Sequence, residues 1–128
     1  MTDTPTSLLI LIAGPYRSGT DDDPIRMEHN LRALEAVALP LFRAGHLPMI
    51  GEWAALPLLR VAGSARVGDA HWDEILYPVA HRLLARCDAV LRLPGDSAGA
   101  DNDVRIARER GLPVYYRLEE VPGCAGQS

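Results

Sequence analysis

Six consecutive apolar residues near the start of the chain, Leu8–Ala13, constrain the fold more than any other feature of the sequence. A strand that faces water on one side alternates apolar and polar residues, so an unbroken apolar run predicts a strand that is buried on both faces. Such strands are typical of parallel sheets with helices on both sides. Gly14 and Pro15 follow the run and predict a turn at its end.

The rest of the chain is expected to alternate between helices and strands. Asp23 before Pro24 predicts a helix N-terminus, and apolar residues at helical spacing continue to Gly45, with a kink at Pro40. Further strands are expected over 47–50, 89–93 and 113–117, and further helices over 54–61, 71–86 and 99–110.

This order predicts one α/β domain over residues 1–120. The domain should be doubly wound and flavodoxin- or Rossmann-like, with a parallel sheet of four to five strands in the order 2-1-3-4. Residues 121–128, which are rich in glycine, are expected to form a flexible tail.

The composition excludes several classes of function. All 13 basic residues are arginines, so Schiff-base chemistry and covalent attachment of pyridoxal phosphate are excluded, because both need a lysine amine. The net charge of −4 argues against a nucleic acid polymer as a partner, because such binding needs a clustered cationic face. Two cysteines without an expected disulfide, and no long apolar segment, predict a cytoplasmic protein that does not bind membranes. No metal and no cofactor are expected.

Two glycine-containing loops are expected to form a pocket for a small molecule. Gly14–Gly19 follows the first strand and residues 94–99 follow the third, and the carboxyl ends of these strands lie together in a doubly wound sheet. Gly14, Pro15 and Gly19 bring backbone amides, and Arg17 brings a guanidinium, which suit a phosphate or a sugar hydroxyl. A simple turn with a solvated Arg17 is the alternative.

Acidic residues follow both loops. The run Asp21–Asp23 has the clustered carboxylates that a divalent cation needs, but a favourable interaction with the following helix N-terminus is the preferred interpretation. In the second loop, Ser97 can cap the next helix, Gly99 lets the backbone approach a ligand, and Asp103 can point back to the pocket. The alternative is that Asp103 only complements the helix dipole.

These residues resemble the nucleoside 2-deoxyribosyltransferase superfamily, which includes deoxynucleoside 5′-monophosphate N-glycosidases. The resemblance rests on Ala13–Tyr16, on Cys87–Val90, and on Ser97, Gly99, Asp103 and Ala107 at the family's spacing. It implies that Asp103 is a nucleophile that attacks the anomeric carbon, and that the chain is a homo-oligomer. It also implies that Tyr16 positions Asp103 and that Arg17 contacts a 5′-phosphate.

The sequence departs from the family at two positions. The family nucleophile is a glutamate, and Asp103 is shorter by one methylene, or about 1.5 Å. Ala80 stands where deoxynucleoside-cleaving members carry an aspartate that serves the leaving base. Glu52, Asp73 and His81 are candidates to replace that acid.

The function that follows is cleavage or transfer of the N-glycosidic bond of a nucleoside or nucleotide, with Arg17, Ser97 and the loop amides expected to hold the phosphate or the sugar. Trp53, next to Glu52 and after the second strand, is expected either to stack on the base or to lie in the core. A binding module for nucleotides, without catalytic activity, remains the alternative.

Overall fold

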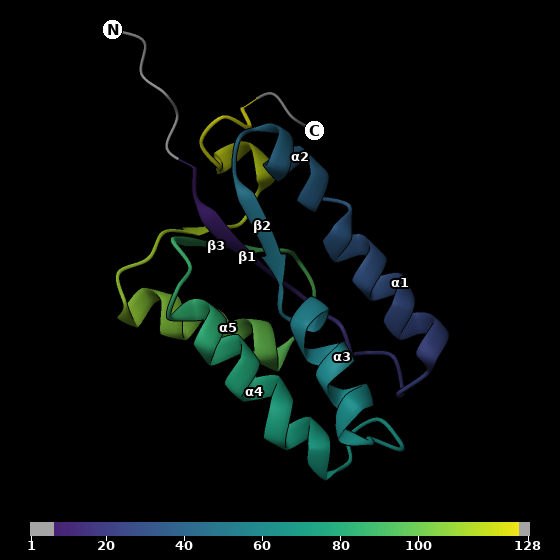
Figure 1. Ribbon diagram of the computed structural model, residues 1–128. Coiled ribbons are helices and arrows are strands. Elements are labelled where there is room, and N and C mark those ends of the chain that lie inside the picture. Colours follow the sequence, from purple (N-terminus) through teal and green to yellow (C-terminus); the bar gives the residue numbers. More distant parts are fainter. Residues whose placement is uncertain (1–6, 126–128) are drawn as a thin grey trace, which may run out of the picture.

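The structure is a computed structural model that describes residues 7–125, and Figure 1 shows its elements. They follow one another as β1 (Leu9–Ala13), α1 (Pro24–Glu35), α2 (Ala38–Arg43), β2 (Leu47–Ile50), α3 (Gly51–Ala62), α4 (Ala70–Leu84), β3 (Ala89–Arg92), α5 (Ala98–Glu109), β4 (Val114–Tyr115) and a short 3-10 helix over Leu118–Glu120.

The four strands form one parallel sheet in the order β2-β1-β3-β4. In the register, Ile12 pairs with Ile50 and Ala13 pairs with Arg92, so β1, β2 and β3 end at the same edge. Figure 1 shows α1 and α2 on one side of the strands and α4 and α5 on the other. The predicted doubly wound α/β domain and its strand order are therefore confirmed.

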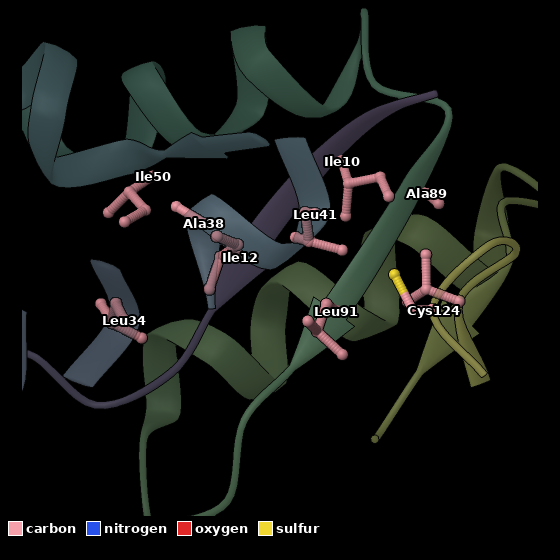
Figure 2. Close-up of a cluster of buried hydrophobic side chains, with 10 residues drawn as sticks. Ile10, Ile12, Leu34, Ala38, Leu41, Ile50, Ala89, Leu91 and Cys124 are labelled. Atoms are coloured by element: carbon pink, nitrogen blue, oxygen red, sulfur yellow. The ribbon is translucent and has the colours of Figure 1, made fainter. Parts of the chain in front are cut away.

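The central strand β1 is buried on both faces, as its apolar run predicts. Ile10 and Ile12 pack into one core cluster with residues of α1 and α2, and Figure 2 shows these side chains together. Leu11 and Ala13 pack into a second cluster with residues of α4 and α5. Each face of β1 therefore packs against one layer of helices. This packing fixes the position of β1 and of the loop that begins at Gly14.

The helix expected from Asp23 to Gly45 is two helices, α1 and α2. Asp23 caps α1, because its carboxylate accepts a hydrogen bond from Ile25 N–H. The break falls at residues 36–37, one turn before Pro40. Proline lacks the N–H that would bond to the carbonyl four residues earlier and its ring clashes with that carbonyl, so the helix is interrupted on the N-terminal side of the proline.

The expected flexible tail is wrong for residues 121–124. Val121 and Cys124 are fully buried in the core cluster that also contains residues of α1 and α2, and Figure 2 shows Cys124 among these side chains. His46 ties this segment to the sheet, with Nδ1 accepting from Leu8 N–H at 3.1 Å and Nε2 lying 2.6 Å from Pro122 O. Residues 126–128 lie outside the described part of the chain.

Two further bounds differ clearly from the sequence-based expectation. Helix α3 begins at Gly51, directly after β2, and not at residue 54. Strand β4 has only two residues and is shorter than the expected 113–117. Cys87 and Cys124 are both buried free thiols. Within residues 7–125, the helices are all too short or too polar to cross a membrane.

Candidate functional site

A cavity of about 270 Å³ lies where β1 and β3 end. The end of β1 and the loop after it form one side, and the starts of α3 and α5 and one face of α4, from Trp72 to Ala80, form the others. The polar and aromatic side chains on its wall are Tyr16, Arg17, Ser18, Glu52, Trp72, Asp73, Tyr77, Ser97 and Asp103.

The two glycine-containing loops meet beside this cavity. Gly95 has a φ of 115°, and a Cβ on it would lie only 2.7 Å from Pro15 Cγ, so the loops are in close contact. A Cβ on Gly14 would lie 2.8 Å from Leu34 Cδ2. Gly14 lines the cavity, whereas Pro15 and Gly19 do not. Pro15 therefore joins the two loops and is not on the cavity wall.

Ser97 fixes the start of α5. Its hydroxyl is buried and accepts a hydrogen bond from Ala100 N–H at 3.1 Å, which is the expected N-cap. Gly99 and Asp103 are four residues apart, so they share one face of the helix, and both line the cavity. Asp101 is on another face and binds Arg92 at 2.9 Å.

The carboxyl groups of Glu52 and Asp103 face the same cavity from α3 and α5. Burial, and after it the charge of Glu52, raise the pKa of Asp103 to about 7, although Arg92 opposes both effects. Burial also raises the pKa of Glu52. Two carboxyl groups in one partly buried site cannot easily both be ionised, so the pair retains a proton at a higher pH than isolated carboxyl groups do.

Tyr16 reaches the cavity from the loop after β1. Asn30 of α1 donates a hydrogen bond to the Tyr16 carbonyl at 2.9 Å and holds this part of the loop. Burial raises the pKa of the Tyr16 phenol, and the charges of Glu52 and Glu28 add to this. Its hydroxyl is therefore a neutral hydrogen-bond donor at neutral pH. Among the described residues, no direct hydrogen bond joins it to Asp103.

Arg17 is bound to Asp22, a partner that the sequence analysis did not identify. Its Nε and Nη2 donate to the two carboxylate oxygens of Asp22 at 2.6 and 3.1 Å. The guanidinium also lies over the ring of Trp72, 5.6 Å from the centroid. No sequence signal distinguishes Asp22 from its two neighbouring aspartates.

The expectation for Trp53 is wrong. Trp53 does not line the cavity and is not in the core, because 37% of it is exposed and its Nε1–H donates to Glu35 of α1 at 2.8 Å. The reason is the early start of α3. Consecutive helical residues point about 100° apart, so Glu52 faces the cavity and Trp53 turns towards α1.

Ala80 lines the cavity, so the position of the family's second acid faces the candidate site here without a carboxyl group. Asp73 also lines the cavity, from one end of α4, whereas His81 is exposed and does not. Asp88 lies at the opposite edge of the sheet and accepts a hydrogen bond from Leu9 N–H at 2.8 Å. Its role is structural.

The acidic run Asp21–Asp23 has separate tasks. Asp22 binds Arg17, Asp23 caps α1, and the Asp21 side chain is 95% exposed. In the described part of the chain, no three histidine, cysteine, aspartate or glutamate side chains are grouped so that they could hold a metal ion.

A comparison of the chain with models of known protein families and with curated proteins finds no match.

Proposed function

We propose that the protein cleaves or transfers the N-glycosidic bond of a nucleoside or nucleotide through a carboxylate nucleophile. One observation carries this proposal: Glu52 and Asp103 share a cavity of about 270 Å³, and the pKa of Asp103 is raised to about 7. Glycoside cleavage uses a pair of carboxyl groups, of which one holds a proton while the other is ionised, and a raised pKa allows one group of such a pair to hold the proton near neutral pH. The resemblance of the Gly99 and Asp103 motif supports the same reaction.

In the first step, an Asp103 carboxylate oxygen forms a bond to C1′ of the sugar, and the bond between C1′ and the base nitrogen breaks. The electron pair of the broken bond stays on the base nitrogen, which takes a proton from Glu52. The reactive form of the pair is the one in which the shared proton is on Glu52 and Asp103 is ionised, and burial, which raises the pKa of Glu52, favours Glu52 as a proton donor. In the second step, water or another base attacks C1′, Glu52 accepts its proton, and Asp103 leaves as a carboxylate.

Other groups on the wall suit the binding of a sugar. The Tyr16 hydroxyl is a neutral donor beside the two carboxyl groups, and Gly99 leaves the start of α5 open to a ligand. Asp73 provides an acceptor for sugar hydroxyls from α4. No metal and no organic cofactor has a part in this mechanism.

The test is direct detection of a free base. The protein is incubated with the common deoxynucleosides and their 5′-monophosphates, and the products are separated by chromatography. A 2-fluoro sugar analogue should trap an adduct on Asp103 that mass spectrometry locates.

Asp103→Asn and Glu52→Gln should each lower the rate of base release at least a hundredfold. Glu109→Gln, on the exposed face of the same helix as Asp103, is the matched control and should have no effect. Absence of free base from every compound would refute the enzymatic proposal.

A nucleotide-binding module without activity is the second candidate, and Ala80 favours it. This residue lines the cavity but offers no proton, and Asp103 is shorter than the glutamate of the family that it resembles. Asp103→Glu separates the candidates. An increase in base release would show that the catalytic site is otherwise complete, whereas ligand-induced thermal stabilisation without base release in both proteins would favour the binding module.

We also propose a homo-oligomer in the cytoplasm. Leu58, Val61 and Tyr77 on α3 and α4 are large apolar side chains that are about half or more exposed. Burial of such side chains against a second copy would remove apolar area from water. Buried, unpaired Cys87 and Cys124 suit a reducing compartment. Sedimentation equilibrium should give at least a dimer, and Val61→Asp should shift it towards the monomer.

A further inference from the structure

The charged side chains that line the cavity are mostly acidic. Glu52, Asp73 and Asp103 bring three carboxyl groups, and among the described residues on the wall only Arg17 brings a positive charge. Arg92, which lies close enough to affect Asp103, is already bound to Asp101 at 2.9 Å. The affinity of this cavity for an anionic ligand therefore depends on whether Arg17 is available.

Asp22 binds two of the three guanidinium nitrogens of Arg17 and pairs with its positive charge. The contact is bidentate, with distances of 2.6 and 3.1 Å, which is the geometry that an arginine also uses for phosphate oxygens. The hydrogen bond to Arg17 lowers the pKa of Asp22, so the carboxylate is ionised at neutral pH. The Asp22 carboxylate therefore takes a position on Arg17 that the phosphate of a ligand could otherwise take.

The loop holds Asp22 in place before any ligand arrives. Thr20 is buried, its hydroxyl donates to the Arg17 carbonyl at 2.5 Å, and the Asp22 N–H donates to the same hydroxyl at 3.2 Å. Asp21 and Asp22 have φ values of 51° and 58°, a left-handed conformation that aspartate tolerates better than most residues. A ligand phosphate must therefore displace a carboxylate that is tethered and already oriented.

The other neighbours of Arg17 hold the guanidinium in the same position. Trp72 lies beneath it, and a Cβ on Gly68 would overlap its Nη2 atom. Gly68 has a φ of 81°, which favours glycine there. The Arg17 side chain remains 48% exposed, but an aromatic ring, a glycine and a carboxylate all contact its guanidinium and favour this one orientation.

We propose that Asp22 is a specificity-determining residue that neutralises Arg17, so that the cavity selects an uncharged nucleoside over its 5′-monophosphate. This inference rests on the proposed function and narrows its substrate class. A 5′-phosphate would enter beside three carboxyl groups without a free cation, whereas a sugar hydroxyl meets neutral and acidic acceptors at no such electrostatic cost.

The test compares the dissociation constants of 2′-deoxyadenosine, 2′-deoxyguanosine, 2′-deoxycytidine and thymidine with those of their 5′-monophosphates, by titration calorimetry at one ionic strength. The unmodified protein should bind the nucleoside of at least one pair more tightly. Asp22→Asn keeps the left-handed backbone accessible and should shift the ratio towards the monophosphate by about 5- to 10-fold. Asp21→Asn, at the neighbouring exposed residue with the same backbone conformation, is the matched control and should leave the ratio unchanged.

The double variant Arg17→Gln with Asp22→Asn should lose the shift, because no guanidinium is then available. Tighter binding of the monophosphate by the unmodified protein would overturn the inference and leave the proposed function intact. The same holds for an unchanged ratio in a folded Asp22→Asn variant, with folding checked by circular dichroism. If none of these compounds binds, the proposed function itself is refuted and the inference with it.

Discussion

Replacement of Asp103 by asparagine should make the protein more stable at alkaline pH. Burial and the nearby charge of Glu52 raise the pKa of Asp103 from 3.8 to about 7. An aspartate in an unfolded chain ionises near pH 4, so between about pH 4 and pH 7 the folded protein holds a proton that the unfolded chain has released. The contribution of Asp103 to the free energy of unfolding is therefore most favourable below this range and falls as the pH rises through it.

The size of the effect follows from the pKa shift. A shift of one pKa unit corresponds to about 1.4 kcal/mol, so the change from 3.8 to about 7 sets an upper limit of about 4 kcal/mol. Because the cavity is open to water and the proton is shared with Glu52, we expect about 2–4 kcal/mol. Asparagine resembles the protonated aspartate in shape, so Asp103→Asn should equal the unmodified protein near pH 3, below the pKa of aspartate in the unfolded chain, and exceed it by this amount near pH 8.5.

Urea denaturation followed by circular dichroism, at intervals across this pH range, measures the difference. Glu109→Gln, a half-exposed carboxyl group on α5 that binds Arg105, is the control and should change the stability by less than about 1 kcal/mol at every pH. A stability difference for Asp103→Asn that is the same at both ends of the range, or a loss of stability at the alkaline end, would refute the electrostatic reasoning about the cavity.

Two other substitutions test the supports of the site. Gly68→Ala should lower the free energy of unfolding by more than Gly63→Ala. Both glycines have positive φ values, where alanine is strained by about 1–2 kcal/mol, but only at Gly68 would the added Cβ meet Arg17. Urea denaturation of both variants therefore isolates the effect of this contact. His46→Phe should cost about 2 kcal/mol in the same assay, because it leaves the backbone groups of Leu8 and Pro122 without their ring partners. Hydrogen exchange at Cys124 should then become faster, and unchanged exchange would contradict the proposed anchoring of this segment.

The sequence was sufficient to predict the parts of the fold that local patterns determine. The apolar run of β1 predicted a strand that is buried on both faces, and the alternation of strands and helices predicted the parallel sheet and its strand order. The break between α1 and α2 was misplaced, because a proline acts on the carbonyl one turn before it. The burial of Val121 and Cys124 was missed because the contact of Pro122 with His46 joins residues 76 positions apart.

In the candidate site, too, local sequence patterns predicted some features, whereas features that depend on distant contacts or exact helix bounds were missed. Strand order places Glu52, Ser97 and Asp103 at one edge of the sheet, and all three line the cavity. Trp53 was misplaced because its direction depends on the residue at which α3 begins. The pairing of Arg17 with Asp22 was not predictable, because it depends on two left-handed residues in one loop and on the approach of Gly68 from another.

The two departures from the resembled family can be understood together under the proposed mechanism. A carboxyl group with an ordinary pKa is ionised at neutral pH and cannot serve as an acid, so a proton for the leaving base must come from a group whose pKa is raised. Ala80 provides none, whereas burial raises the pKa of both Glu52 and Asp103, and the charge of Glu52 raises that of Asp103 further. An aspartate at position 80 would add a further carboxyl group to a wall that already carries three, and the repulsion among them would grow. The alanine therefore keeps the proton within the pair of Glu52 and Asp103, where one carboxyl group can act as the acid while the other acts as the nucleophile.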